Sequence, residues 1–183
     1  MEYMLVLQPS DQVNEKVLLE KQDFSHQYGT KTTPKSKPYI TIATFLAKEA
    51  MEGTLNRWIN NICRQQQGFE LTLNNFSGFP PDTIYVRVQD PMPVFTLTQQ
   101  LKKLDDFMRS SECPPMKFSY KPYLAIAQKL SMETFEKALK NYSQKEFHES
   151  FAVEELILLK RSHEFDASSL VNKYHFVSGS GNS

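Results

Sequence analysis

One seven-residue segment occurs twice in this chain. Residues 37–43 read Lys-Pro-Tyr-Ile-Thr-Ile-Ala, and residues 121–127, which begin 84 positions later, read Lys-Pro-Tyr-Leu-Ala-Ile-Ala. Each copy has the aliphatic and aromatic composition of a β-strand and is followed by an amphipathic helical pattern. A strand and a helix that recur in the same order predict a duplicated unit. We therefore expect two similar lobes within the 183 residues.

Hydrophobic periodicity along the rest of the chain predicts a mixture of strands and helices. We expect strands at residues 3–7, 39–45, 69–73, 84–88, 120–128, 149–159 and 173–177. We expect a first helix capped by Ser10 and ended by Gly29, and a second along the apolar stripe from Met51 to Ile62. A third helix is expected to begin at the capping-box spacing of Thr96 and Gln99, and a fourth is expected to be capped by Ser131.

This order of elements favours an α+β fold, an α/β sandwich of two pseudo-symmetric lobes. Each lobe is expected to hold a sheet with antiparallel strands, with helices on the outside and a cleft between the lobes. We expect a single bilobal domain over residues 1–178. The Thr-, Lys- and Pro-rich residues 30–38 predict a loop, and the Gly- and Ser-rich residues 179–183 predict a flexible tail.

Side chains alternate between the two faces of a strand, so the repeat predicts which residues lie together. In the first copy Tyr39, Thr41 and Ala43 share one face, and in the second copy Tyr123, Ala125 and Ala127 do so. These faces either oppose each other across a cleft, or the tyrosines simply cover their sheets with their hydroxyls hydrogen-bonded.

The charges balance over the whole chain but are unevenly distributed. The sequence has 21 basic and 21 acidic residues, which argues against a strongly basic nucleic-acid binder. Both copies of the repeat nevertheless lie in stretches without acids, residues 24–48 and 113–132. The lysines of these stretches either make a cleft positive and favour an anionic ligand, or are solvated on loops. They are Lys31, Lys35, Lys37, Lys48, Lys117, Lys121 and Lys129. Lys37 and Lys121 lie two residues before the tyrosines and share their face if the strand geometry extends through the intervening proline.

Other signals of chemistry are weak. Cys63 lies in an apolar helical pattern and predicts a buried free thiol, and no Cys or His spacing predicts a metal site. We expect no cofactor. No stretch approaches the length of about 20 apolar residues that a membrane span needs, and we expect a monomer in the cytoplasm.

At the repeated segment the chain resembles the two-histidine phosphoesterases, the family of RNA ligase T-like 2′-5′ RNA ligases and cyclic nucleotide phosphodiesterases. The family signature is one His-x-Thr/Ser strand in each lobe, which here matches Pro38 to Ile42 and Pro122 to Ile126. Residues 151–160 are similar to the family's strand after the second motif. The resemblance covers residues 1–178 and implies an RNA ligase T-like domain with a central cleft.

The resemblance also implies which residues stand at the motif positions. Tyr39 and Tyr123 replace the two histidines, Ala125 replaces the second Thr/Ser, and Thr41 is retained. In the family the histidines act as base and acid on a 2′,3′-cyclic phosphate or a 2′-5′ linkage, which needs groups that titrate near neutral pH. Tyrosine has an ordinary pKa of about 10, so lowering it to 7 would cost roughly 4 kcal/mol at each site. No motif position therefore predicts an intact catalytic residue.

Three functions stay open. The first is a protein with a degenerate active site that binds a nucleotide, an RNA end or another phosphorylated small molecule through Tyr39, Thr41, Tyr123, Lys37 and Lys121. The second is a phosphoesterase with altered chemistry. The third is a non-catalytic structural or partner-binding protein whose cleft is closed by the tyrosine rings.

Overall fold

The structure is a computed structural model that describes residues 1–30, 37–163 and 166–178. It contains helices and two antiparallel sheets, which confirms the predicted α+β fold with two lobes. Most of the loop predicted at residues 30–38 lies outside the described residues. So do the predicted tail at residues 179–183 and two lysines of the first acid-free stretch, Lys31 and Lys35.

Each copy of the repeat forms one strand, and the two strands belong to different sheets. The first sheet has the strand order β5-β2-β1-β8-β9. Its strands are β1 (Glu2–Leu7), β2 (Ile40–Leu46), β5 (Lys117–Phe118), β8 (Glu155–Arg161) and β9 (Ser169–His175). The second sheet has the order β6-β4-β3-β7. Its strands are β3 (Phe69–Phe79), β4 (Thr83–Val88), β6 (Tyr123–Ala127) and β7 (His148–Val153).

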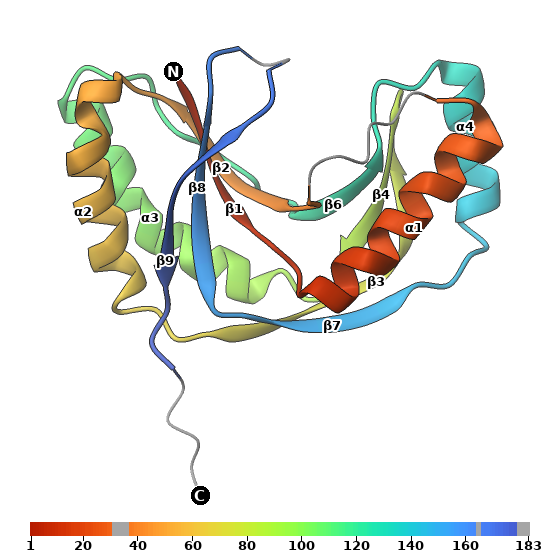
Figure 1. Cartoon of the computed structure of the whole chain (residues 1–183), viewed down its shortest axis with the longest axis horizontal. Coiled ribbons are helices and arrows are strands. Elements are labelled where there is room, and N and C mark those ends of the chain that lie inside the picture. Colours follow the sequence, from red (N-terminus) through yellow and green to blue (C-terminus); the bar gives the residue numbers. More distant parts are fainter. Residues whose placement is uncertain (31–36, 164–165, 179–183) are drawn as a thin grey trace, which may run out of the picture.

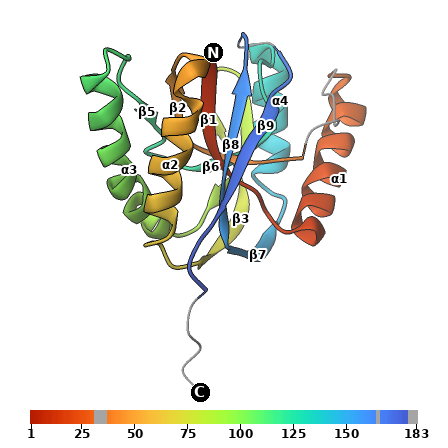
Figure 2. The same cartoon turned by 60° about the vertical axis from the view of Figure 1, so that its left-hand side comes forward.

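The helices cover the outer faces of the sheets (Figure 1). Helices α2 (Glu52–Cys63) and α3 (Met92–Ser110) lie against the first sheet, and a short 3-10 helix, η1 (Glu49–Met51), leads into α2. Helices α1 (Asp11–Tyr28) and α4 (Met132–Tyr142) lie against the second sheet. Figure 2 shows α2 and α3 side by side, with α1 on the far side of the molecule. We call each sheet with its two α-helices a lobe.

The lobes are interleaved along the chain. Helix α1 follows β1 of the first sheet yet packs on the second sheet, and β8 and β9 return to the first sheet after β7. The two lobes are therefore not the two halves of the sequence, although each contains one copy of the repeat.

Three helix ends confirm the sequence signals. The Ser10 hydroxyl accepts a hydrogen bond from the Val13 amide at 3.4 Å, and the Ser131 hydroxyl accepts one from the Thr134 amide at 3.2 Å. Gly29 ends α1 in the left-handed conformation, with φ of 62°. Such caps satisfy backbone groups that a helix leaves without an internal partner.

The predicted start of α3 is wrong. The helix begins at Met92, one turn before Thr96, and the Thr96 hydroxyl donates to the Met92 carbonyl at 3.1 Å inside the helix. The Asp90 carboxylate accepts the Met92 amide at 2.9 Å, and Pro93 in the first turn has no amide proton to satisfy. Asp90 and Pro93 therefore replace the predicted capping box.

The long strand predicted at residues 149–159 is two strands in different sheets. The break falls at Glu154, where β7 stops pairing with β3 and β8 begins to pair with β1. The strand predicted at residues 120–128 is shorter than expected, since β6 begins at Tyr123 and Tyr120 is exposed.

Both repeat strands contain an irregularity at the same position. In the pairing of β1 with β2 the register skips Ile42, and in the pairing of β4 with β6 it skips Ile126. These two isoleucines occupy equivalent positions in the two copies of the repeat. A β-bulge of this kind bends a strand and changes which side chains share a face.

Candidate functional site

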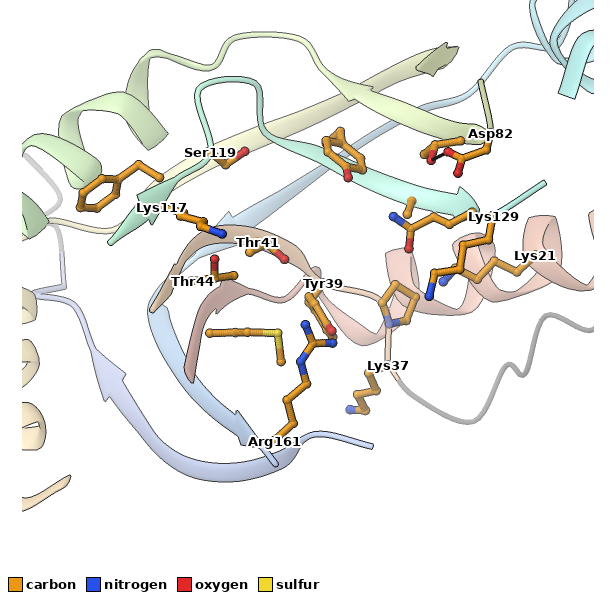
Figure 3. Close-up of a pocket in the computed structure, with 17 residues that line it drawn as sticks. Lys21, Lys37, Tyr39, Thr41, Thr44, Asp82, Lys117, Ser119, Lys129 and Arg161 are labelled. Carbon is orange, nitrogen blue, oxygen red and sulfur yellow. Dashed lines mark hydrogen bonds between the residues drawn. The ribbon is translucent and has the colours of Figure 1, made fainter. Parts of the chain in front are cut away.

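A cavity of about 720 Å³ lies between the two sheets, where β2 and β6 approach each other (Figure 3). Cavities of this size hold nucleotide-sized molecules. Its lining comes from both lobes: Met4, Lys21, Lys37, Pro38, Tyr39, Thr41, Thr44, Asp82, Thr83, Lys117, Phe118, Ser119, Tyr123, Ala125, Gln128, Lys129 and Arg161.

The structure brings the four motif positions together. Tyr39, Thr41, Tyr123 and Ala125 all line this one cavity, although the two copies are 84 residues apart. The expectation that Ala43 and Ala127 share this face is wrong, since both are buried in the main core and neither lines the cavity. Ala43 is fully buried in the main core, because the bulge at Ile42 reverses the alternation. Thr44 lines the cavity in its place.

The two tyrosines are held by different surroundings. Tyr39 packs on a small aliphatic cluster of Met4, Val6 and Ile157 on the first sheet. Tyr123 packs on aromatic rings of the second sheet. Its ring centroid lies 5.0 Å from that of Phe79 in an edge arrangement and 5.2 Å from that of Tyr85. Packed rings of this kind present a hydroxyl in a defined place at low entropic cost.

The cavity lining is positive. Among the described residues that line it there are five lysine or arginine side chains and one carboxylate, that of Asp82. Clefts that concentrate one sign of charge attract ligands of the opposite sign. The prediction of a positive cleft from the acid-free stretches agrees with this lining.

The structure does not bring the predicted pair of Lys37 and Lys121 together in the cavity. Lys37 lines the cavity, and its ammonium lies 2.8 Å from the exposed Asp11 carboxylate. The Lys121 ammonium lies 5.0 Å from the centroid of the Phe79 ring, and Lys121 is not part of the cavity lining. The alternation of side chains between the two faces of the strand therefore does not extend through Pro122 to place Lys121 in the cavity.

Other cations take the place of Lys121. Lys117 in β5 and Lys129 after β6 come from the second acid-free stretch. Arg161 at the end of β8 lines the cavity and donates to the Glu2 carboxylate. Lys21 comes from the middle of α1, and burial lowers the pKa of its ammonium below the ordinary value. The sequence pattern held no sign of Lys21 or Arg161, because neither lies near a motif.

Histidines do not contribute to this cavity within the part of the chain that the structure describes. His26, His148, His163 and His175 are all exposed and lie on four separate segments. In that same part of the chain no cluster of Cys, His, Asp and Glu is placed to hold a metal ion. None of its helices combines the length and the apolar character that crossing a bilayer requires.

The arrangement is suited to holding an anion. Tyrosine, threonine and serine hydroxyls from both sheets offer donors to phosphate oxygens, and the cations supply the charge.

Comparisons with known proteins agree with this architecture. The family model described as the 2′-5′ RNA ligase superfamily matches residues 9–164. A search of curated proteins found no match.

Several solved structures share the fold. TT0787 of Thermus thermophilus is 12% identical with a TM-score of 0.71, covering 96% of this chain and 98% of that one. LigT of E. coli in its apo form is 15% identical with a TM-score of 0.69, covering 96% of each chain. LigT complexed with 3′-AMP is 12% identical with a TM-score of 0.68, covering 96% of this chain and 97% of that one. The match of the family model over most of the sequence shows that the chain belongs to the 2′-5′ RNA ligase superfamily.

Proposed function

We propose that this protein binds a nucleotide, an RNA end or another phosphorylated small molecule in the cavity between its lobes, without the two-histidine reaction of the family. The observation that carries the proposal is the lining of one cavity by Tyr39, Thr41 and Tyr123 together with cations from both lobes. Phosphate is the common anion that matches several hydroxyl donors and a positive surround.

Two further observations support this proposal. The bulges at Ile42 and Ile126 support a duplication in which Tyr39 and Tyr123 are equivalent residues. The structural neighbour LigT has been crystallised with 3′-AMP, with NADP+ and with ATP. A shared fold with nucleotide-bound structures makes nucleotides the first ligands to test.

The non-catalytic part of the proposal depends on the residues that face the cavity. Acid–base catalysis near neutral pH uses groups such as histidine, and the described lining contains tyrosine at the two motif positions and no histidine. We propose that Tyr39 and Tyr123 replace the catalytic pair and bind the ligand through their hydroxyls and rings. The cytoplasmic location and the monomeric state remain predictions from the sequence.

The cavity volume separates this proposal from a purely structural role. A structural protein whose cleft is closed by tyrosine rings would leave little space, whereas about 720 Å³ remains between the sheets. The other alternative, an enzyme with altered chemistry, differs from this proposal because it would turn over a phosphoester substrate.

Binding is tested by thermal unfolding in the presence of 3′-AMP, ATP, NADP+ and a short RNA with a terminal phosphate. A ligand at 100 times its Kd stabilises a protein by about 2.7 kcal/mol, so we expect a clear rise in Tm with at least one of them. The double variant Thr41→Val with Lys117→Met is expected to lose this rise. Lys102→Met, an exposed lysine of α3 that is not in the cavity lining, is the matched control and keeps it.

Catalysis is tested with 2′,3′-cyclic AMP and with a 2′-5′-linked dinucleotide. We expect no product above the rate without protein. Product formation that disappears in Tyr39→Phe would instead support the altered chemistry. Absence of any Tm change across the ligands at millimolar concentration would contradict the binding proposal.

A further inference from the structure

Two of the cavity's cations lie together on the second lobe. Lys21 comes from α1, and Lys129 follows the end of β6, against which α1 packs. Figure 3 shows both side chains at the end of the cavity away from Lys117 and Thr44, with Tyr39 and Thr41 between the two ends. Lys117 therefore lies at one end of the cavity and Lys21 and Lys129 at the other, with Arg161 and Lys37 on the side of Tyr39.

Within the described part of the chain, Lys21 is a cation without a carboxylate partner. Its side chain is half-buried, and no carboxylate among the described residues lies within ion-pair distance of its ammonium. Lys37 and Lys160, by contrast, each lie within 3.0 Å of a carboxylate oxygen. Burial disfavours the charged form of a lysine unless an anion is nearby, and the lowered pKa of Lys21 has burial as its cause. An anion from outside the protein would supply the missing partner.

Lys129 holds an uncommon backbone conformation. Its φ is 57°, in the left-handed region that glycine adopts readily and a long side chain does not. The flanking structure enforces this conformation, since the Leu130 amide donates to the Asp82 carbonyl at 3.1 Å and Ser131 caps α4. The backbone of Lys129 is therefore held in place beside the cavity, and its side chain is part of the cavity lining.

We propose that Lys21 and Lys129, with the side-chain amide of the neighbouring Gln128, form a second anion subsite. This subsite binds a second phosphate of the ligand. The ligand is then a nucleotide with two phosphates, one held near Tyr39, Thr41 and Lys117 and the other at the α1 end. This assignment rests on the proposed function. Asp82 also lines this end of the cavity, where its carboxylate accepts the Thr83 hydroxyl at 2.8 Å. Two lysines and one carboxylate therefore line the subsite.

The test compares two dinucleotides that differ in one phosphate, ApA and 5′-phosphorylated pApA, by calorimetry at low ionic strength. We expect wild-type protein to bind pApA about tenfold more tightly than ApA, which corresponds to about 1.4 kcal/mol. Lys21→Met is expected to remove this advantage and to weaken the binding of ApA much less than that of pApA. Equal affinity of wild-type protein for the two ligands, or an equal loss for both in Lys21→Met, overturns the inference.

The variant Lys129→Gly distinguishes the contribution of the Lys129 side chain to binding from the strain in its backbone. Relief of the left-handed strain is expected to raise Tm by about 2–4 °C, while the preference for pApA disappears. Glu112 is the matched control, because its φ is 61° and it is exposed outside the cavity lining. Glu112→Gly is expected to raise Tm similarly and to keep the preference. A Lys129→Gly variant that still prefers pApA overturns the inference.

A second measurement separates this inference from the proposed function. Inorganic pyrophosphate is added to ¹⁵N-labelled protein, and the amide signals of Lys21, Gln128 and Lys129 are compared with those of Thr41 and Lys117. If pyrophosphate shifts the signals at the α1 end but no nucleotide binds, the result supports the anion subsite and contradicts the proposal that the ligand is a nucleotide. Absence of shifts at the α1 end overturns the subsite even if Thr41 and Lys117 respond.

Discussion

The two cysteines of this protein lie in opposite environments. Cys63 is fully buried at the end of α2, and burial raises the pKa of its thiol to about 12. Cys113 is half-exposed, with its Sγ 3.7 Å from the Met51 Sδ. Because the thiolate is the reactive form, only Cys113 is expected to react at pH 8 in the folded protein.

Titration with Ellman's reagent at pH 8 checks this prediction. We expect one thiol to react in the native state and two in guanidinium chloride. Cys113→Ser is the control and is expected to show no reactive thiol until it is unfolded. Two rapidly reacting thiols in the native protein would contradict the buried position of Cys63.

At the residue scale the sequence located part of the candidate site. Tyr39, Thr41, Tyr123 and Ala125 were found because alternation along a strand depends only on local backbone geometry. Lys21 was missed because its place in the cavity depends on α1 packing on the other lobe, a tertiary event without a local signal. Ala43 was misplaced because a bulge has no reliable sequence pattern.

At the element scale, β3 and α4 approach so closely that they require glycine at one position. A Cβ atom at Gly78 would lie 2.9 Å from Phe135 Cε2 and 3.0 Å from Leu139 Cδ1. Gly78→Ala is therefore expected to lower the free energy of unfolding by about 1–3 kcal/mol, measured by urea denaturation.

Gly53→Ala is the matched control for this prediction. Gly53 lies in α2 with no atom within 4 Å of the added Cβ, so alanine is expected to stabilise the helix by up to about 1 kcal/mol. If Gly78→Ala proved as stable as the wild type, α4 would not pack on β3 as described.

A polar network joins β1, α2 and β8. The Lys160 ammonium lies 2.8 Å from the Glu52 carboxylate, which also accepts the buried Tyr3 hydroxyl at 2.8 Å. The bond from Lys160, followed by that from Tyr3, lowers the pKa of Glu52. Glu52→Gln is expected to lower the free energy of unfolding by about 1–2 kcal/mol at pH 7.

The pH dependence of this effect has a definite sign. A carboxyl whose pKa is lowered by folding stabilises the protein above its ordinary pKa of about 4.3, and this stabilisation is lost as pH falls through the folded value. The difference between wild type and Glu52→Gln is therefore expected to shrink between pH 5 and pH 3. Glu133→Gln, in an exposed pair with Lys137, is expected to leave stability unchanged at both pH values. A difference that grows in acid would contradict the network.

Most elements were predictable because their ends carry chemical signals, such as Ser10 and Gly29 of α1. The division between β7 and β8 was not predictable, because residues 149–159 join two apolar stretches without a proline or glycine between them. The residues before Glu154 pair with β3 and those after it pair with β1, and this change of partner divides the strand. The carbonyl of Glu154 is satisfied by the Phe176 amide at 2.8 Å, a contact that only the tertiary fold provides.

At the scale of the whole molecule, one continuous hydrophobic core joins the lobes. It includes Leu5 and Leu55 of the first lobe and Leu73 and Phe135 of the second. Because the lobes share this core and an interleaved chain, they are expected to unfold together in a single transition.

The single tryptophan gives a direct check of this cooperativity. Trp58 lies in the first lobe, where its ring stacks on Phe107 at a centroid distance of 5.3 Å, whereas far-UV circular dichroism reports on both lobes. The urea unfolding curves from tryptophan fluorescence and from circular dichroism are expected to coincide. A separate, earlier change in Trp58 fluorescence would show that the first lobe unfolds alone.

The interleaved path of the chain has a mechanical consequence for the cavity. The chain passes between the lobes before and after α1, before β3, between β4 and α3, between β5 and β6, and between β7 and β8, so no single hinge connects them. Rotation of one lobe away from the other would require several backbone segments to bend at once. The width of the cavity is therefore expected to be set by the backbone of the two sheets. We expect the backbone of the free and the ligand-bound protein to differ little.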